Sequence, residues 1–175
     1  ENKKIQREVI VSIGTLGNPK GTEHLLKIFR AEESSTPLKA LVMESIGNLG
    51  DYSASEDIIK SLRKEQLRIP GLIALGKMRE EKAIPHIEEI LFDSTSNEEV
   101  KSTCIDTLIK IQKKESITSM IKVLKNRNIE ATLKRLLIES FPKMGEVIIK
   151  PFVEELRKDQ ENEELNKSLV KILGN

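Results

Sequence analysis

Aromatic residues are scarce in this chain: they make up 3% of the sequence, with no tryptophan and a single tyrosine. Strand-rich folds usually contain more aromatic and β-branched side chains, so this shortage argues against them. Charged residues are plentiful instead, at 33%, and lysine, glutamate, leucine and isoleucine dominate. Such a composition is typical of long amphipathic helices and predicts an all-α fold.

Cysteine is also nearly absent, because Cys104 is the only one. A single cysteine excludes an intrachain disulfide and any zinc site built from several cysteines. Cys104 lies in a segment of helical apolar periodicity, so we expect a buried and unreactive thiol.

An excess of charge of one sign is missing as well, since the formal net charge is +1. The overall charge therefore gives no argument for binding nucleic acid or an anionic membrane. No apolar run approaches the ~20 residues that span a bilayer, so we expect no membrane insertion. The first residue, Glu1, is not methionine. We expect a fragment of a longer protein that works in the cytoplasm, or in the periplasm if a leader has been removed.

A short motif recurs along the chain, and this repetition is the strongest signal in the sequence. It is Ser-Ile-Gly-Thr-Leu-Gly at 12–17 and Ser-Ile-Gly-Asn-Leu-Gly at 45–50. Degenerate copies begin at Ala74, Thr107, Ser140 and Ser168, so the spacings are 33, 29, 33, 33 and 28 residues. A second set of apolar segments keeps nearly the same period, starting at Leu25, Ile58, Ile87, Met120 and Phe152. Each period therefore contains two helices.

The two periodic signals predict the helix boundaries. The expected pairs are 3–16 with 19–31, 37–49 with 53–64, 69–78 with 82–92, 97–112 with 115–125 and 129–141 with 146–158, followed by a last helix at 161–173. The third period is four residues shorter than its neighbours, and Pro70-Gly71 replaces a helical turn there. We expect a late-starting or kinked helix at that point.

Local chemistry agrees with these boundaries. Asn18 and Thr36 each precede a proline, which predicts N-caps with proline in the first helical turn, and Asn97 is a third candidate cap. Gly17 and Gly50 follow first helices, where a left-handed residue closes a helix.

The first predicted helix has one apolar stripe, formed by Ile5, Val9, Ile13 and Leu16 beside Ile10. An isolated helix pair cannot cover such a stripe, whereas stacked neighbouring pairs can. The sequence therefore predicts a solenoid that is held together by nearest-neighbour interfaces.

Helix pairs of about 30–33 residues, with Ile-Gly-x-Leu-Gly closing the first helix and an Asn-Pro or acidic turn before the second, resemble HEAT repeats. The chain is most similar to short bacterial HEAT-like repeats of the kind seen in phycobilin lyases, over essentially all of residues 1–175. The resemblance implies a single domain, a right-handed α-solenoid of about five and a half repeats with an armadillo-like superhelix. It also implies that the second helices line the concave face, and that the commonest use of this face is to bind a protein.

Residues suited to catalysis or metal binding are few. His24 and His86 occupy the same position in repeats one and three, which should place them too far apart to share one metal. A HEAT-repeat hydroxylase uses His-Glu pairs, but here Leu25 and Ile87 follow the histidines. Neither a nucleophile elbow nor a glycine-rich phosphate loop is present. We expect no enzyme activity, no cofactor and no metal.

The predicted second helices share a column of charged positions, formed by Lys27, Lys60, Glu89, Lys122 and Glu154, which bears on alternative functions. A HEAT-like DNA-binding protein or DNA glycosylase would need a continuous basic groove, and the acidic members interrupt it. A bilin lyase would need more aromatic residues than Phe29, Phe92, Phe141 and Phe152, which we expect to be packing residues. A structural spacer in a larger protein is a further alternative.

The interpretation favoured by the sequence is a non-enzymatic scaffold that binds a protein or peptide along its second helices. A face of mixed charge suits the orientation of a protein partner better than the binding of a polyanion. The candidate partner-binding residues are Lys27, Arg30, Lys60, Arg63, Glu89, Lys122 and Glu154.

Overall fold

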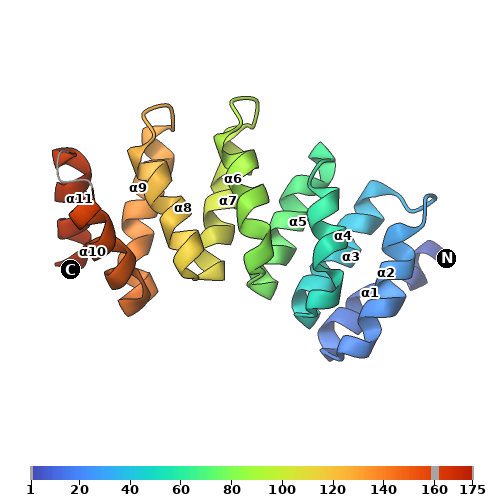
Figure 1. The fold of residues 1–175 in the computed structure, drawn as a ribbon. Coiled ribbons are helices and arrows are strands. Elements are labelled where there is room, and N and C mark those ends of the chain that lie inside the picture. The colour runs from blue at the N-terminus through green and yellow to red at the C-terminus, as the bar shows by residue number, and fades with distance from the viewer. Residues whose placement is uncertain (1, 159–161, 175) are drawn as a thin grey trace. The chain divides into compact units, whose positions relative to one another are not determined.

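The structure of the chain is a computed structural model, which describes residues 2–158 and 162–174. Every regular element in these ranges is helical, and none is a strand (Figure 1), so the predicted all-α class is confirmed. The chain divides into two compact units, Glu1–Ile87 and Glu88–Asn175, which are described separately below. The single domain expected over residues 1–175 stays a prediction.

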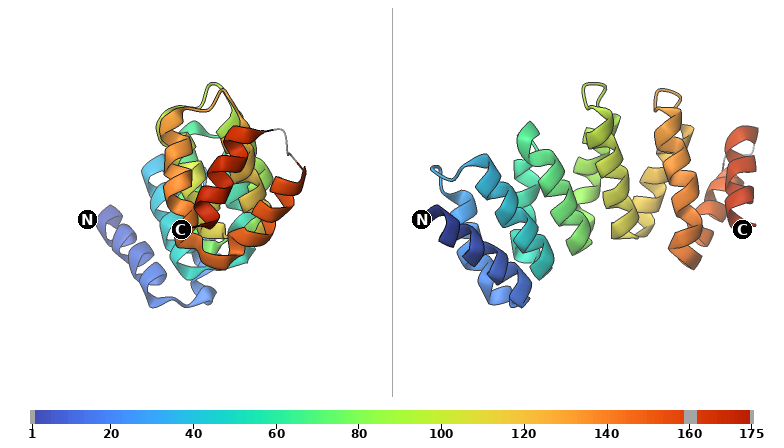
Figure 2. Two further views of the ribbon diagram at one scale, coloured as in Figure 1. Left: turned by 90° about the vertical axis from the view of Figure 1, so that its left-hand side faces the viewer. Right: turned by 180° about the vertical axis from the view of Figure 1, so that it is seen from behind.

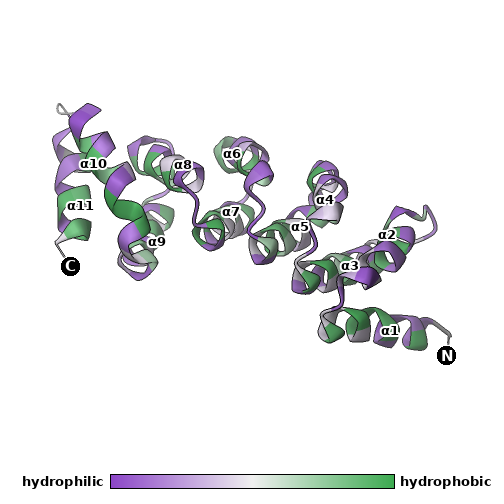
Figure 3. Ribbon diagram, turned by 60° about the horizontal axis from the view of Figure 1, so that its bottom comes forward, coloured by the Kyte–Doolittle hydropathy of each residue, from purple (hydrophilic) through white to green (hydrophobic). Residues whose placement is uncertain are grey.

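Unit 1 is built from helices that alternate between two layers. Its elements are α1 (Asn2–Leu16), η1 (Pro19–Gly21), α2 (Thr22–Arg30), α3 (Thr36–Leu49), η2 (Tyr52–Ala54), α4 (Ser55–Ser61), α5 (Glu65–Met78), η3 (Glu81–Ala83) and the start of α6 (Ile84–Phe92). The first helices of successive pairs pack on one another, α1 on α3 and α3 on α5. Helices α2 and α4 pack against α3 and α5 from the other layer (Figure 3).

Unit 2 repeats this alternation. Its elements after α6 are α7 (Glu98–Ile111), α8 (Lys114–Lys125), α9 (Ala131–Ser140), η4 (Phe141–Ile148), α10 (Ile149–Lys158) and α11 (Glu163–Leu173). Helix α7 contacts α8 and α9, and α10 contacts both α8 and α11 (Figure 2).

The expected helix boundaries are largely matched, with two informative differences. Helix α5 begins at Glu65, four residues before the predicted start, and continues through Pro70. The missing N–H of one proline near the start of a helix removes a single hydrogen bond, which tertiary packing can offset. Helix α10 begins at Ile149, three residues after the predicted start at 146, because η4 with its non-helical Gly145 lies between α9 and α10. The predicted first residue of the last helix, position 161, lies outside the described residues.

Left-handed residues recur with the period of the sequence. The positive φ angles belong to Gly17 (67°), Gly50 (66°), Arg79 (54°), Gln112 (53°) and Gly145 (68°). Their spacings of 33, 29, 33 and 33 residues equal those of the sequence motif. Gly17 and Gly50 therefore have the predicted conformation. Arg79 and Gln112 adopt it without glycine, at a cost of roughly 1–2 kcal/mol each.

Two of the three expected caps are present. The Asn18 side chain accepts a hydrogen bond from the Lys20 N–H at 3.1 Å, and Asn97 accepts one from the Val100 N–H at 2.9 Å. The prediction for Thr36 is wrong, because Thr36 is the first residue of α3 and the cap position belongs to Ser35.

Glycine lets the first helices of unit 1 approach closely. A Cβ placed on Gly14 of α1 would lie 2.8 Å from the Cα of Ser45 on α3. The same addition at Gly47 of α3 would lie 2.9 Å from the Cα of Ala74 on α5. Ser45 and Ala74 occupy equivalent positions in the repeat, so each interface pairs a glycine with a small residue on the following first helix.

Burial confirms most of the expected core and corrects one part of it. Phe141 and Phe152 are fully buried and pack edge to face, with ring centroids 4.8 Å apart. Of the predicted apolar stripe on α1, however, Ile10 is buried and Ile13 is half-buried, while Ile5, Val9 and Leu16 are exposed. The expectation that stacked neighbours cover this stripe is therefore wrong for α1, because α3 packs on the opposite face, at Gly14.

Replacing Gly47 by alanine tests the close approach. Alanine favours helix by about 1 kcal/mol over glycine, but its Cβ would overlap the α5 backbone. We expect a net loss of about 1–3 kcal/mol in the free energy of unfolding, measured by urea denaturation. Gly174→Ala is the control, because its Cβ would meet nothing nearer than 3.5 Å. Equal stability of Gly47→Ala and wild type would contradict the proposed contact.

Glycine substitution tests the two strained left-handed residues. Arg79→Gly and Gln112→Gly should each raise the free energy of unfolding by about 0.5 kcal/mol, because relief of the left-handed strain exceeds the entropy cost of glycine. Lys110→Gly, in the last turn of α7, should instead lower it by about 1 kcal/mol. Chemical denaturation of the three variants provides the comparison, and a loss of stability in Arg79→Gly would refute the assignment.

Candidate functional site

The predicted partner-binding residues of unit 1 form a repeated charge pattern on α2 and α4. Lys27 pairs with Glu23 at 2.9 Å, and Lys60 pairs with Glu56 at 3.6 Å. Each pair joins residues i and i+4 of one helix, and the two pairs are 33 residues apart. Both lysines are highly exposed, so these ion pairs contribute little to the free energy of unfolding. Their amines stay accessible to a partner.

Arg30 differs from Lys27 and Lys60 because its ion pair joins two helices. Its Nε and a terminal nitrogen donate to the two carboxylate oxygens of Asp57 on α4, at 3.1 and 2.8 Å. The hydrogen bonds from Arg30 hold the pKa of the Asp57 carboxyl below its ordinary value. Arg63, one period after Arg30, is exposed just beyond the end of α4.

In unit 2 the predicted residues take part in ion pairs between neighbouring second helices. Lys122 on α8 lies 2.7 Å from Glu88 on α6, and Lys114 on α8 lies 3.0 Å from Glu154 on α10. A third pair joins Lys125 on α8 to Glu155 on α10 at 2.8 Å. Glu89, the remaining predicted residue, is exposed on α6.

Two adjacent glutamates of α10 take part in the ion pairs between helices. Glu154 and Glu155 are half-buried, and they pair with Lys114 and Lys125 of α8. The hydrogen bond from Lys114 lowers the pKa of Glu154. The lysines of α8 are therefore paired across helices, whereas Lys27 and Lys60 of unit 1 pair within their own helices.

Two hollows include predicted residues. One, of about 490 Å³, lies in unit 1 between α1, α2 and the start of α3, with Lys27, Ile28 and Leu38 in its lining. The other, of about 350 Å³, lies between α8 and α10, where Lys122 and Lys125 border Ile121. Both are shallow surface features that combine apolar and charged groups.

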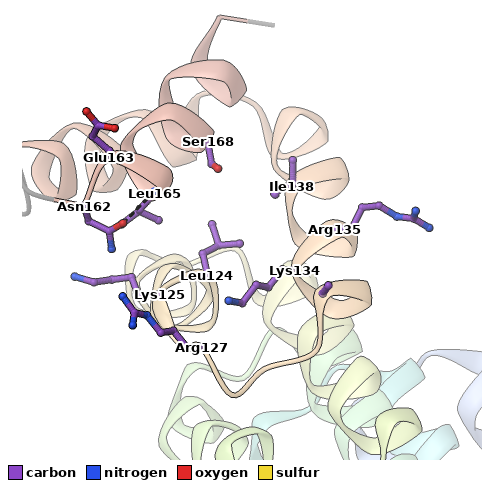
Figure 4. A pocket seen from close by; sticks show the side chains of 11 residues that line it. Leu124, Lys125, Arg127, Lys134, Arg135, Ile138, Asn162, Glu163, Leu165 and Ser168 are labelled. Carbon is purple, nitrogen blue, oxygen red and sulfur yellow. Dashed lines mark hydrogen bonds between the residues drawn. The ribbon is translucent and has the colours of Figure 1, made fainter.

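A larger hollow of about 700 Å³ lies in unit 2, between the end of α8, α9 and the N-terminus of α11 (Figure 4). Lys125, Arg127 and Lys134 are among its lining residues, and Arg135 points away from it. Opposite charge is also present, because Glu163 lines the hollow and Glu155 pairs with Lys125. Its lining therefore combines charges of both signs with the apolar side chains of Leu124 and Ile138.

The residues considered for chemistry are scattered. His24 is exposed on α2, His86 is exposed on α6, and Cys104 is fully buried on α7, as predicted for its thiol. Within residues 2–158 and 162–174, no three histidine, cysteine, aspartate or glutamate side chains gather as a metal site would require. Over the same residues, no helix has the length and apolar character that a bilayer span needs.

Sequence reasoning missed two buried charged residues. Glu80 accepts hydrogen bonds from the Ser55 hydroxyl and, at 3.0 Å, from the Lys82 N–H. Lys101 on α7 donates to Glu130, beside the start of α9, at 3.2 Å. Glu80 could have been found, because it occupies the cap position that Asn18 and Asp51 hold in the preceding repeats. Both buried charges join neighbouring elements and have a structural role.

Comparison with known proteins does not identify a family for the chain. No protein-family model matches the chain, and none of the curated proteins is significantly similar to it. The HEAT-like resemblance thus remains an expectation based on the sequence motif.

The Arg30–Asp57 pair predicts a pH-dependent contribution to stability. The pKa of Asp57 is lower in the folded state, so the contribution is complete above the unfolded pKa of about 3.9 and disappears as pH falls through the folded value. We expect Arg30→Gln to lower the thermal midpoint by about 2 °C at pH 7 and by less at pH 2.5.

Arg63→Gln is the matched control, since it removes the same charge one repeat later without breaking a described ion pair. Its midpoint should follow wild type at both pH values in thermal unfolding monitored by circular dichroism. An Arg30→Gln deficit that persists unchanged at pH 2.5 would rule out the ion pair as its cause.

Proposed function

We propose that the chain is a right-handed α-solenoid of HEAT-like helix pairs that acts as a non-enzymatic interaction module. In this proposal, a partner protein lies along the second helices and is oriented by their charged residues. Lys27 and Lys60 are the principal contacts, and Arg63 extends the same surface.

The repeated backbone supports the solenoid part of the proposal. Residues with positive φ at 17, 50, 79, 112 and 145 keep the period of the sequence motif. Glycine also meets a small residue at equivalent positions in the α1–α3 and α3–α5 interfaces. A solenoid is the architecture in which every repeat meets its neighbour in this same way.

The observation that carries the binding proposal is the repeated Glu–Lys pair on α2 and α4. Glu23–Lys27 and Glu56–Lys60 present the same mixed charge on two successive second helices. Neighbouring helices pack about 8–10 Å apart, so these pairs form a ladder of alternating sign. A protein segment with the complementary alternation would gain specificity and a faster association rate from this ladder.

The charge distribution disfavours the nucleic-acid alternative. A polyanion requires several cations acting together, and its affinity grows with the number of phosphates that they neutralise. Here Lys27 and Lys60 alternate with glutamates, and Arg30 is engaged by Asp57.

Charge reversal at the two exposed lysines tests the proposal. Immobilised wild-type protein and the Lys27→Glu/Lys60→Glu variant are compared for capture of proteins from a cell extract by quantitative mass spectrometry. We expect at least one specific partner whose capture falls roughly tenfold in the variant, because two like charges now oppose it. Thermal stability should change little, since both lysines are highly exposed.

Lys20→Glu/Lys82→Glu is the matched control, with the same change of charge on two exposed turn residues of unit 1. It should capture the partner as wild type does. Equal capture by wild type and the Lys27/Lys60 variant would disprove the assignment of this surface. A duplex DNA titration at low salt is the second arm, and tight, steeply salt-dependent binding there would favour the nucleic-acid function instead.

A further inference from the structure

One face of α1 is exposed, whereas the equivalent faces of α3 and α5, the other first helices of unit 1, are largely buried. On α3 the four equivalent positions are Leu38, Val42, Ser45 and Leu49, of which Val42, Ser45 and Leu49 are buried and Leu38 is half-buried. On α5 they are Leu67, Gly71, Ala74 and Met78, all buried. On α1 they are Ile5, Val9, Ser12 and Leu16, all exposed, and Leu16 reaches 79%.

The structure shows what covers this face on α3 and on α5. Gly14 of α1 meets Ser45, and Gly47 of α3 meets Ala74. Ser12 occupies the position of Ser45 and Ala74 on α1. The four residues Ile5, Val9, Ser12 and Leu16 are here called the outer face of α1.

The covering helix runs in the same direction as the helix it covers. Gly21 lies next to Ile13, near the end of α1, and within reach of Leu49, at the end of α3. The C-terminal ends of α1 and α3 therefore lie together. A helix that packs on the outer face in the same way would therefore run parallel to α1 and would meet the side chains of the outer face.

We propose that the outer face of α1 is a docking surface for a helix of a partner polypeptide with the chemistry of α1 and α3 themselves. That helix runs parallel to α1, places a glycine over Ser12, and packs apolar side chains against Ile5, Val9 and Leu16. This surface is distinct from the charged second-helix surface, and the two can fail or succeed separately.

Interface continuity is the argument for this occupant. On α3, and again on α5, these equivalent positions contact a helix that carries a glycine. On α1 the same positions keep a small residue, Ser12, with apolar residues beside it. A second copy of the chain fits less well. Its Gly14 and Gly47 faces are already engaged within unit 1 and could be offered only by opening it.

A tandem chain, in which residues 1–33 are repeated ahead of Glu1, tests the surface with the full protein present. The added length equals one period, so Gly14 of the extra copy precedes Ser12 by the same 31 residues that separate Gly14 from Ser45. Docking would bury Ile5, Val9 and Leu16, and we expect the thermal midpoint to rise by about 4 °C over the parent chain.

Ser12→Arg, placed only in the original copy, is the decisive variant. In the parent chain Ser12 is exposed, so the substitution should leave the midpoint unchanged. In the tandem chain it should abolish the rise in thermal midpoint, because a long charged side chain would occupy the place where the glycine of the added helix meets Ser12. Hydrogen exchange of residues 5–16 should slow in the tandem chain and recover in the variant. Tandem chains that melt alike with and without Ser12→Arg, or show no rise at all, would overturn the proposal.

Light scattering of the parent chain from 5 to 500 µM tests the competing occupant. A monomer throughout is expected. A concentration-dependent dimer that Leu16→Glu abolishes would assign the outer face to a second copy and would overturn the proposed partner helix.

Discussion

The contact between a glycine on one first helix and a small residue on the next is the constraint on which unit 1 depends. Gly14 faces Ser45, and Gly47 faces Ala74, at distances that leave no room for a methyl group. Close approach of the helix backbones brings the flanking apolar residues into contact, and Val42, Met43 and Ile46 of α3 are fully buried as a result. The second helices then pack against the first helices that this contact has aligned.

The parts of the fold that depend on short-range patterns were predictable from sequence. Helix ends, the Asn18 and Asn97 caps and the left-handed Gly17 and Gly50 follow from local residue preferences. The start of α5 was not, because a proline normally argues against helix and only tertiary packing shows that Pro70 is tolerated. The left-handed Arg79 and Gln112 could have been predicted from the period alone, although neither residue type indicates this conformation.

Sequence periodicity indicates which residues occupy equivalent positions, but it does not indicate how they pair. Sequence periodicity placed Lys27 and Lys60 on equivalent exposed positions of α2 and α4. It could not reveal that Lys122 and Glu154 face opposite charges on neighbouring helices, since such pairs depend on the offset between helices. The exposure of Ile5, Val9 and Leu16 was likewise beyond a helical-period argument, which identifies an apolar face and not what covers it.

The short spacing of 29 residues between the second and third motifs shows where this architecture can change length. The missing residues belong to the second helix and to the segment that follows it. Helix α4 has seven residues where α2 has nine, and the connection to the next first helix shortens from 31–35, between α2 and α3, to 62–64, between α4 and α5. The Gly47–Ala74 crossing is untouched by this loss. Insertions and deletions should therefore be tolerated between the end of a second helix and the next first helix, and excluded from the turn of helix that carries the glycine.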